Sequence, residues 1–297
     1  MIKRRKVTLG VCIRNSASTI KETIRSIICQ DYPHDLIEVI FVDDGSEDAT
    51  LLIIKEHIPM MDMQVKVFHQ EWKGIGFSRN IVVNNAEGDY IVWVDGDMIL
   101  PKNHVRIQVE FMEQNLDVGI AKARYGLITE ENIIATLENL SFVISYLQNE
   151  TSNSMLPGTG GAIYRVEAIR QIGGFDNRLK EAGEDVDAAY RIKMAGWNLR
   201  VSPAFFYEKS RRTWLELWKR YFKHGYSSYY LYSKNKNVFS LLRMSPPASF
   251  IKGILFIPDA YRLIHRKSVL LLPFHFLFKM SAWFTGFTIS KIKSSNA

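Results

Sequence analysis

Short apolar runs alternate with amphipathic segments through the first hundred residues. The intervening segments carry helical spacing or helix-start signals, with isoleucines recurring from Ile20 to Ile28 and further helices predicted within Thr50–Ile58 and Gly74–Asn85. Strands joined by helices imply right-handed crossovers and a mostly parallel α/β sheet. The runs predicted as buried strands are Val7–Ile13, Leu36–Val42, Val65–Phe68 and Tyr90–Val94.

Polar residues follow the predicted strands at their carboxyl ends. Asn15 follows the first strand, Asp43 and Asp44 end the second, and Asp95 and Asp97 follow the fourth. In an open parallel sheet the ligand cleft lies at this edge. Because unrelated turn residues have no reason to converge there, we expect these side chains to form one site.

Asp95 and Asp97 bring two hard oxygen donors to the end of a buried strand, with Gly96 between them. In extended backbone the two carboxylates would share a face, and glycine would leave room for a ligand. Such a pair suits a divalent cation that carries a diphosphate. Taken alone, the same three residues also fit an ordinary strand-end turn.

A glycine-containing loop precedes the third predicted helix. Gly74 and Gly76 are followed by Arg79 and not by a third glycine, and His69–Lys73 before them is not predicted as a strand. The pattern therefore lacks the dinucleotide-binding fingerprint, which argues against a nicotinamide cofactor.

Composition allows a large buried core, because 47% of the 297 residues are hydrophobic. The net charge of +7 favours anionic partners, and the basic residues near Lys3–Lys6 and after Lys209 make a membrane surface as plausible as a soluble anion. Cys12 and Cys29 have no metal-site spacing and are predicted to be reduced core thiols. The apolar run Val7–Ile13 is short, so we interpret it as a strand and not as a targeting segment.

The order of these motifs resembles the GT-A-fold glycosyltransferases of family 2. The resemblance covers roughly residues 5–230 and implies a GT-A-like (Rossmann-like) mixed, mostly parallel sheet flanked by helices. It also implies a nucleotide-sugar donor and a divalent cation, Mg²⁺ or Mn²⁺. The segments that carry it are Asn15, Asp43–Ser46, Gly74–Asn80, Asp95–Asp97, Gly158–Gly161, Gly173–Asp176 and Gly183–Asp187 with Arg191.

The resemblance also implies roles for individual donor-site residues. Asp97 would hold the cation, and Asp95 would contact the cation or the donor's ribose. Asp43 would face the nucleotide base with Asp44 nearby, and Asn15 is placed in the same donor site. Arg79 would reach the base or the diphosphate, since a guanidinium matches phosphate oxygens; the alternative is an ordinary cation on a helix surface.

Glu184 and Asp185 open a predicted helix, and the resemblance makes Asp185 the catalytic base. Acidic residues in a first turn are also ordinary partners of the helix dipole, and Asp187 with Arg191 has the spacing of an i,i+4 pair. A sugar hydroxyl needs a general base, whereas an ionised polyprenyl phosphate does not. The pair therefore favours a hydroxyl acceptor.

The chain departs from the family at two places. Family members often carry a histidine as third metal ligand after the strand that follows the Glu-Asp helix, but residues 205–209 contain none, so Glu208 is the candidate substitute. Residues 217–225 also lack the Gln-x-x-Arg-Trp motif of processive synthases. We therefore expect transfer of one sugar and not polymerisation.

The C-terminal part has a different character, and we expect a catalytic domain over residues 1–232 and a helical membrane-associating region over 233–297. Aromatic and basic residues interleave from Ser210 to Tyr232, as in nucleic-acid stacking surfaces or in helices at lipid headgroups. Pro246 and Pro247 are expected to break the chain, and Phe250–Ile264 is amphipathic.

Residues 268–290 are long enough to span a bilayer, but Lys279 lies near the middle, and Pro273 and Gly286 interrupt the segment. Two apolar runs, Val269–Phe278 and Met280–Ile289, fit an embedded or re-entrant pair better than one span. Interfacial attachment, a spanning helix and a helix packed on the catalytic domain remain open.

Together these features predict a metal-dependent, inverting glycosyltransferase at the cytoplasmic face of a membrane. It would move one sugar from a nucleotide-diphosphate donor to a lipid-linked or surface glycan. The alternatives are transfer to a polyprenyl phosphate and a non-catalytic module that binds nucleotide sugars or glycans. No nucleic-acid partner is expected.

Overall fold

The computed structural model describes residues 5–148, 156–209 and 212–295, which form two units. Unit 1 comprises residues 1–126, 149–180 and 184–208, and unit 2 comprises residues 127–148, 181–183 and 209–297. This division differs from the boundary predicted at residue 232, because helices α5 (Ile133–Gln148) and α8 (Trp214–Lys234) fall in unit 2.

Unit 1 contains a mixed, mostly parallel sheet with the strand order β3-β2-β1-β4-β7-β6-β8-β5. Strand β1 pairs in parallel with β2 and β4, and β3 pairs in parallel with β2. Strand β7 is antiparallel to both of its neighbours, and β5 is antiparallel to β8. The strands are β1 (Val7–Ile13), β2 (Ile37–Asp44), β3 (Gln64–Gln70), β4 (Tyr90–Trp93), β5 (Met98–Ile99), β6 (Val118–Tyr125), β7 (Ala162–Arg165) and β8 (Asn198–Glu208).

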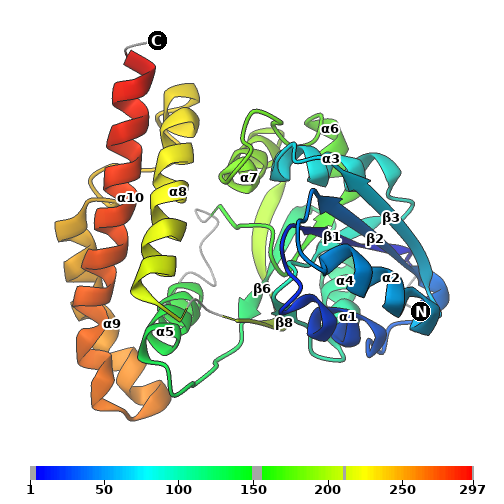
Figure 1. Ribbon diagram of the computed structural model, residues 1–297, viewed down its shortest axis with the longest axis horizontal. Helices are drawn as coiled ribbons and strands as arrows, with labels where there is room; N and C mark the ends of the chain where they lie inside the picture. Colours follow the sequence, from blue (N-terminus) through cyan, green and yellow to red (C-terminus); the bar gives the residue numbers. More distant parts are fainter. Residues whose placement is uncertain (1–4, 149–155, 210–211, 296–297) are drawn as a thin grey trace. The chain divides into compact units, whose positions relative to one another are not determined.

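Helices cover both faces of this sheet (Figure 1). One apolar core lies between the sheet and helices α1 (Ile20–Ile28), α2 (Thr50–His57) and α4 (His104–Gln114). The other core lies between the sheet and helices α3 (Ile75–Asn85), α6 (Val166–Gln171) and α7 (Glu184–Met194). Burial on both faces explains why the central strands are continuous apolar runs.

The predicted strands and helices of unit 1 are confirmed, with one correction to a strand boundary and one to a cysteine. Strand β3 extends through Gln70, so the prediction that His69–Lys73 contains no strand was wrong at its first two residues. Cys12 is buried, and burial raises its pKa to about 12. Cys29 is exposed at the C-terminus of α1 and is not a core thiol as predicted.

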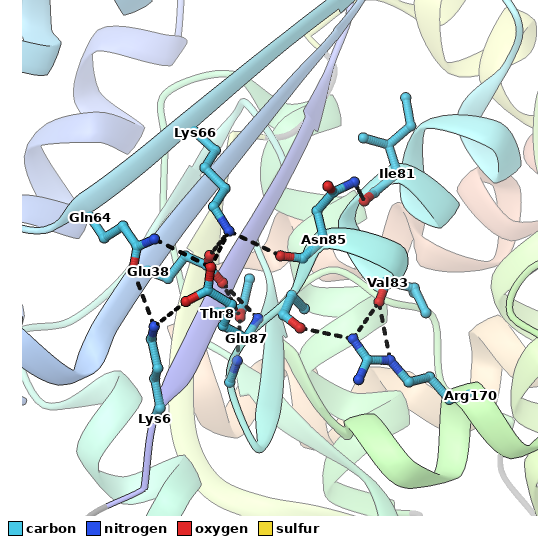
Figure 2. Close-up of polar contacts among 12 residues, drawn as sticks. Lys6, Thr8, Glu38, Gln64, Lys66, Ile81, Val83, Asn85, Glu87 and Arg170 are labelled. Carbon is cyan, nitrogen blue, oxygen red and sulfur yellow. Dashed lines mark hydrogen bonds and ion pairs between the residues drawn. The ribbon is translucent and has the colours of Figure 1, made fainter.

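A polar network ties the amino ends of the first three strands to the loop before β4 (Figure 2). Glu38 is buried on β2, where it accepts a hydrogen bond from Thr8 Oγ1 at 2.7 Å and pairs with Lys66 Nζ at 2.6 Å. Lys66 also pairs with Glu87 at 2.7 Å, as does Lys6 at 2.6 Å. Hydrogen bonds from these two lysines lower the pKa of Glu87 to about 2. The charges at this edge therefore hold the strands in register.

Unit 2 is helical, and α8 runs beside α10 (Leu272–Ser295) (Figure 1). Two glycines allow this close approach: a β-carbon at Gly225 would overlap the carbonyl oxygen of Trp283, and one at Gly286 would overlap that of Phe222. The remaining elements of the unit are α5, α9 (Pro246–Ile264) and the 3₁₀ helix η3 (Lys267–Leu271).

The break expected at Pro246 and Pro247 coincides with the start of a helix, whereas the interruption expected at Gly286 is wrong. Pro246 and Pro247 begin α9, where their missing N–H groups cost nothing. Pro273 lies in the first turn of α10, and Gly286 lies inside α10 as a packing residue, so one continuous helix replaces the two predicted apolar runs. By length and composition Lys267–Ser295 could cross a membrane, but 56% of its most apolar window is buried inside the protein, as in a core helix.

Lys279 is compatible with this helix because it is buried against α5. Its ammonium lies 2.9 Å from Glu138 Oε2 and 2.8 Å from Ser141 Oγ, and His275 Nε2 lies 2.8 Å from the same Glu138 oxygen. Burial by itself would raise the pKa of Glu138, but Lys279 and His275 hold it well below its usual range. We call Glu138, His275 and Lys279 the buried triad.

Candidate active site

The turn after β4 presents Asp95 at the carboxyl edge of the sheet. The carbonyl of Asp95 accepts a hydrogen bond from Met98 N at 3.1 Å, so Asp95–Asp97 is a tight turn and not the extended segment expected. The Asp95 side chain is 41% exposed. Loss of surrounding water raises the pKa of the Asp95 carboxyl, and the neighbouring Arg79 opposes that shift. The turn therefore offers a carboxylate beside a buried cation.

Arg79 on α3 is buried and not a helix-surface cation. Its Nη1 forms an ion pair with Glu184 Oε1, and its Nη2 lies 3.8 Å from Asp95 Oδ1. The guanidinium also lies over the rings of Trp93 and Phe175, at 5.8 and 5.7 Å. Arg79 therefore links the turn after β4 to the start of α7.

The first two residues of α7 have different environments. Glu184 is 3% exposed; one of its oxygens pairs with Arg79, and the other has no hydrogen-bond partner among the described residues. Asp185 is half-buried, and its Oδ1 accepts from Val186 N at 2.8 Å. Its Oδ2 lies 3.0 Å from where a β-carbon on Gly158 would be. Asp185 is therefore the more accessible carboxylate of the two.

The glycine loop 158–161 lies against both Asp95 and Asp185. A β-carbon on Gly160 would lie 2.6 Å from Asp95 Oδ2, so only glycine fits at this position. The next residue, Gly161, donates its N–H to the carbonyl of Trp93 at 2.9 Å, which fixes the loop to the end of β4. The loop thereby brings the backbone next to both carboxylates.

Sequence reasoning missed Lys122, which projects from β6 into this group of charges. The side chain is buried, and its ammonium donates to the carbonyl of Gly160. Burial lowers the pKa of Lys122 to about 8, while Asp95 and Glu208 act in the opposite direction. A lone lysine within the apolar strand Val118–Tyr125 is the sequence signal that could have found it.

Glu208, the predicted substitute for the missing histidine, ends β8. It pairs in register with Met98, directly after the turn that carries Asp95 and Asp97, and its side chain is nearly buried. Its charge raises the pKa of the Asp95 carboxyl, after the larger effects of burial and Arg79.

The second strand contributes loop-organising residues. Asp43 accepts from Ser46 Oγ and, at 2.7 Å, pairs with His69 Nδ1. Asp44 accepts from Lys73 N and Gly74 N, both at 2.9 Å. Asp43 thereby organises the loop after β2, and Asp44 organises the loop after β3.

Asn15, in left-handed backbone with φ of 52°, accepts from Glu47 N at 2.8 Å. The backbone N–H of Asn15 donates a hydrogen bond to Ser46 Oγ at 2.9 Å. Asn15 thereby joins the loop after β1 to the loop after β2.

Among the described residues, no group of three or more His, Cys, Asp or Glu is arranged to hold a metal ion. Mg²⁺ in nucleotide sites is commonly bound by one or two carboxylates together with substrate phosphates. Asp95 and Asp97 lie on one turn, and a cation bound there would need a diphosphate to complete its coordination. They do not provide a preformed cage.

Comparison with known proteins agrees with this architecture. The family model for glycosyl transferase family 2 matches residues 8–173, more than half of the chain. The chain is similar to the poly(ribitol-phosphate) β-N-acetylglucosaminyltransferase TarS of Staphylococcus aureus, with 31% identity over 120 residues, or 40% of this chain and 21% of that protein. It is also similar to glycosyltransferase GlyA of Streptococcus pneumoniae, with 31% identity over 192 residues, or 61% of this chain and 27% of that protein.

Solved structures share the fold at low identity. A Pyrobaculum calidifontis mannosyltransferase, solved with GDP-mannose and Mn²⁺, aligns over 98% of this chain and 88% of its own, with a TM-score of 0.68 and 20% identity. Residues 1–349 of TarS, solved with UDP, align over 98% of this chain and 92% of their own, with a TM-score of 0.53 and 20% identity. With a matching sheet and a family model over residues 8–173, the chain belongs to glycosyl transferase family 2 and has the GT-A fold.

Proposed function

We propose that the chain is an inverting glycosyltransferase that moves one sugar from a nucleotide-diphosphate donor to an acceptor hydroxyl. The observation that carries this proposal is the joint position of Arg79, Asp95 and the half-buried Asp185 beside the glycine loop 158–161. A cation and carboxylates of this kind suit a diphosphate leaving group on one side and a proton acceptor on the other.

In the proposed reaction, the acceptor oxygen attacks the anomeric carbon from the face opposite the diphosphate. A carbon–oxygen bond forms, the bond from that carbon to the diphosphate oxygen breaks, and Asp185 takes the hydroxyl proton. Negative charge develops on the departing diphosphate. Arg79, a buried guanidinium next to Asp95, is proposed to stabilise that charge. A divalent cation bound at Asp95 and Asp97 would neutralise further charge there.

The remaining donor contacts follow from the edge of the sheet. Asp43 is proposed to accept a hydrogen bond from the nucleotide base, with Asp44 and Asn15 shaping the loops around it. Glu208 is proposed to complete the carboxylate set around the cation, in place of the histidine found elsewhere in the family.

The two alternatives differ in what they require of Asp185. A polyprenyl phosphate is already ionised and needs no general base, and a binding module needs no catalysis at all. Because Asp185 keeps an accessible oxygen beside the loop while Glu184 is engaged with Arg79, a hydroxyl acceptor is favoured.

We further propose that the acceptor is lipid-linked or part of a surface glycan, and that unit 2 attaches the enzyme to the cytoplasmic face of a membrane. Residues 209–297 contain 16 Lys and Arg but only two Asp and Glu, whereas the full chain contains 38 and 31. Six of the exposed apolar side chains of this unit lie on α9, η3 and the first turn of α10, where Phe250 contacts Phe274 with ring centroids 5.6 Å apart. These six, which we call the α9–η3 apolar surface, are Ile251, Ile254, Leu255, Leu270, Leu271 and Phe274.

An anionic lipid surface matches both properties, because it attracts basic residues and accepts apolar side chains at the headgroup boundary. The buried triad is consistent with interfacial attachment, since Lys279 and His275 of α10 are paired with Glu138 of α5 inside the unit.

A panel of nucleotide sugars and nucleoside diphosphates, tested with Mn²⁺, examines the donor part of the proposal. A binding nucleotide raises the melting temperature according to its concentration relative to its Kd. One nucleotide sugar is expected to stabilise the protein and to be cleaved when a glycan acceptor is present. Stabilisation without cleavage for any donor and acceptor tested would support the binding module instead.

A further inference from the structure

Lys122 is a buried lysine whose ammonium lies at the glycine loop of the donor site. It is 1% exposed, and its ammonium donates to the carbonyl of Gly160, the residue at which an added β-carbon would lie 2.6 Å from Asp95 Oδ2. The charges of Asp95, Glu208 and Asp185 all act on it. The hydrogen bond to Gly160 therefore places the ammonium on the loop that lies against Asp95 and Asp185.

The surroundings of Lys122 fix its position. Its Nζ lies 4.9 Å from the ring centroid of Phe206 and 5.3 Å from that of Tyr125. Aromatic faces attract an ammonium, and the aliphatic stem is enclosed in the apolar strand β6. A buried cation with these partners stays near the carboxylates whether or not a ligand is present.

Arg79 supplies a second buried cation, which approaches Asp95 Oδ1, whereas the loop lies at Asp95 Oδ2. It pairs with Glu184 and approaches Asp95 to 3.8 Å. Two cations thus accompany the carboxylates Asp95, Asp185, Glu184 and Glu208, which reduces the field that would draw a divalent cation into the empty site. A diphosphate brings new negative charge and changes this balance.

We propose that Lys122 is the built-in counter-charge of the donor site, so that a divalent cation binds tightly only together with the diphosphate of the donor. This inference rests on the proposed function, because it assigns an order to the binding of donor and metal. Replacing the ammonium with a neutral side chain leaves Arg79 as the remaining counter-charge and is expected to strengthen metal binding in the nucleotide-free protein.

The test is titration of Mn²⁺ into nucleotide-free protein, followed by electron paramagnetic resonance, for the wild type, Lys122→Met and Lys122→Gln. Lys122→Gln retains a donor for the Gly160 carbonyl without the charge. The matched control is Lys102→Met, which removes an exposed lysine of the same unit. Removing one positive charge from beside the carboxylates is expected to tighten Mn²⁺ binding about tenfold, and Lys102→Met is expected to leave it unchanged.

A second arm uses the wild type alone, in case neither Lys122 variant folds. Mn²⁺ binding is measured with and without UDP or GDP, and coupling of the two ligands must be reciprocal. Tighter Mn²⁺ binding in the presence of a nucleotide supports the inference. Equal Mn²⁺ affinity with and without a bound nucleotide, or unchanged or weaker Mn²⁺ binding in folded Lys122 variants, would overturn it. If no nucleotide binds at all, the proposed function fails, whereas the Lys122 titration still tests the counter-charge.

Discussion

The guanidinium of Arg79 forms a buried ion pair with Glu184, a residue 105 positions further along the chain. The pair joins α3 to the first turn of α7, and Asp185 is the next residue of that turn. Glu184 therefore acts as a positioning residue for its neighbour and for Arg79. From the sequence, Glu184 and Asp185 are expected together in the catalytic site, with Asp185 as the base and without a separate role for Glu184.

Glu184→Gln is expected to lower both stability and transfer. Removing one partner leaves Arg79 as an uncompensated buried charge, which typically costs about 3–5 kcal/mol. Misplacement of Asp185 by about 1 Å is expected to lower kcat about a hundredfold. Urea unfolding and a transfer assay measure the two effects, with Glu181→Gln, an exposed acid, as control. A fully active, equally stable Glu184→Gln enzyme would refute the positioning role.

Lys279→Met is expected to destabilise the protein by about 3–5 kcal/mol, because it leaves Glu138 charged and buried. Replacing both partners, as in Glu138→Leu with Lys279→Met, should recover most of that loss, since apolar residues of similar size can replace a buried pair. Lys291→Met, on the exposed part of the same helix, is the control. If the single and double variants unfold at the same urea concentration, the two residues are not coupled.

His104 is expected to make stability fall in mild acid. Burial lowers its pKa to about 4, and its Nδ1 lies 2.6 Å from the carbonyl of Phe205, to which the neutral ring donates. The unfolded chain binds the proton at higher pH than the folded chain does, so this contribution is complete above pH 6.5 and decreases as pH falls towards 4.

Between pH 7.5 and pH 5 the loss attributable to His104 is about 2 kcal/mol. Urea unfolding at the two pH values measures it, and His104→Asn should show a correspondingly smaller difference between them. An identical pH dependence in the wild type and the variant would rule out a buried, neutral His104 as its source.

Binding to vesicles tests the α9–η3 apolar surface. Ile251→Asp with Leu255→Asp introduces two acids where the side chains are 58% and 67% exposed, and co-sedimentation with anionic vesicles should drop about tenfold or more. Leu52→Asp, at an exposed position of unit 1, should bind like the wild type. Equal binding by the double variant would remove this surface as the attachment site, and equal binding of the wild type to neutral vesicles would remove the role of its charge.

Much of unit 1 could be predicted from sequence because its strands are buried on both faces. Continuous apolar runs such as Val7–Ile13 and Tyr90–Val94 have few alternatives to a central strand, and their polar ends mark the ligand edge. The extent of β3 was harder to predict, because β3 is an edge strand whose residues, including His69, are exposed or only partly buried.

The C-terminal helices could not be predicted so well, because their polar residues are satisfied by distant partners. Lys279 was expected to interrupt an apolar segment, but Glu138, 141 positions earlier, neutralises it. Gly286 was read as an interruption, but it provides the contact surface for Phe222 of α8. Lys122 was missed for the same reason, since its partners lie on other strands and loops.

The most direct test of the proposed chemistry compares transfer and donor binding in Asp185→Asn. The amide keeps the size of the side chain but cannot take the hydroxyl proton, so transfer to a glycan acceptor should fall by about 10²–10⁴-fold. Proton transfer plays no part in donor binding, so the Kd of the nucleotide sugar with Mn²⁺ should stay within about twofold of the wild type. Wild-type transfer rates in Asp185→Asn would contradict the account, because the hydroxyl proton would then leave by another route.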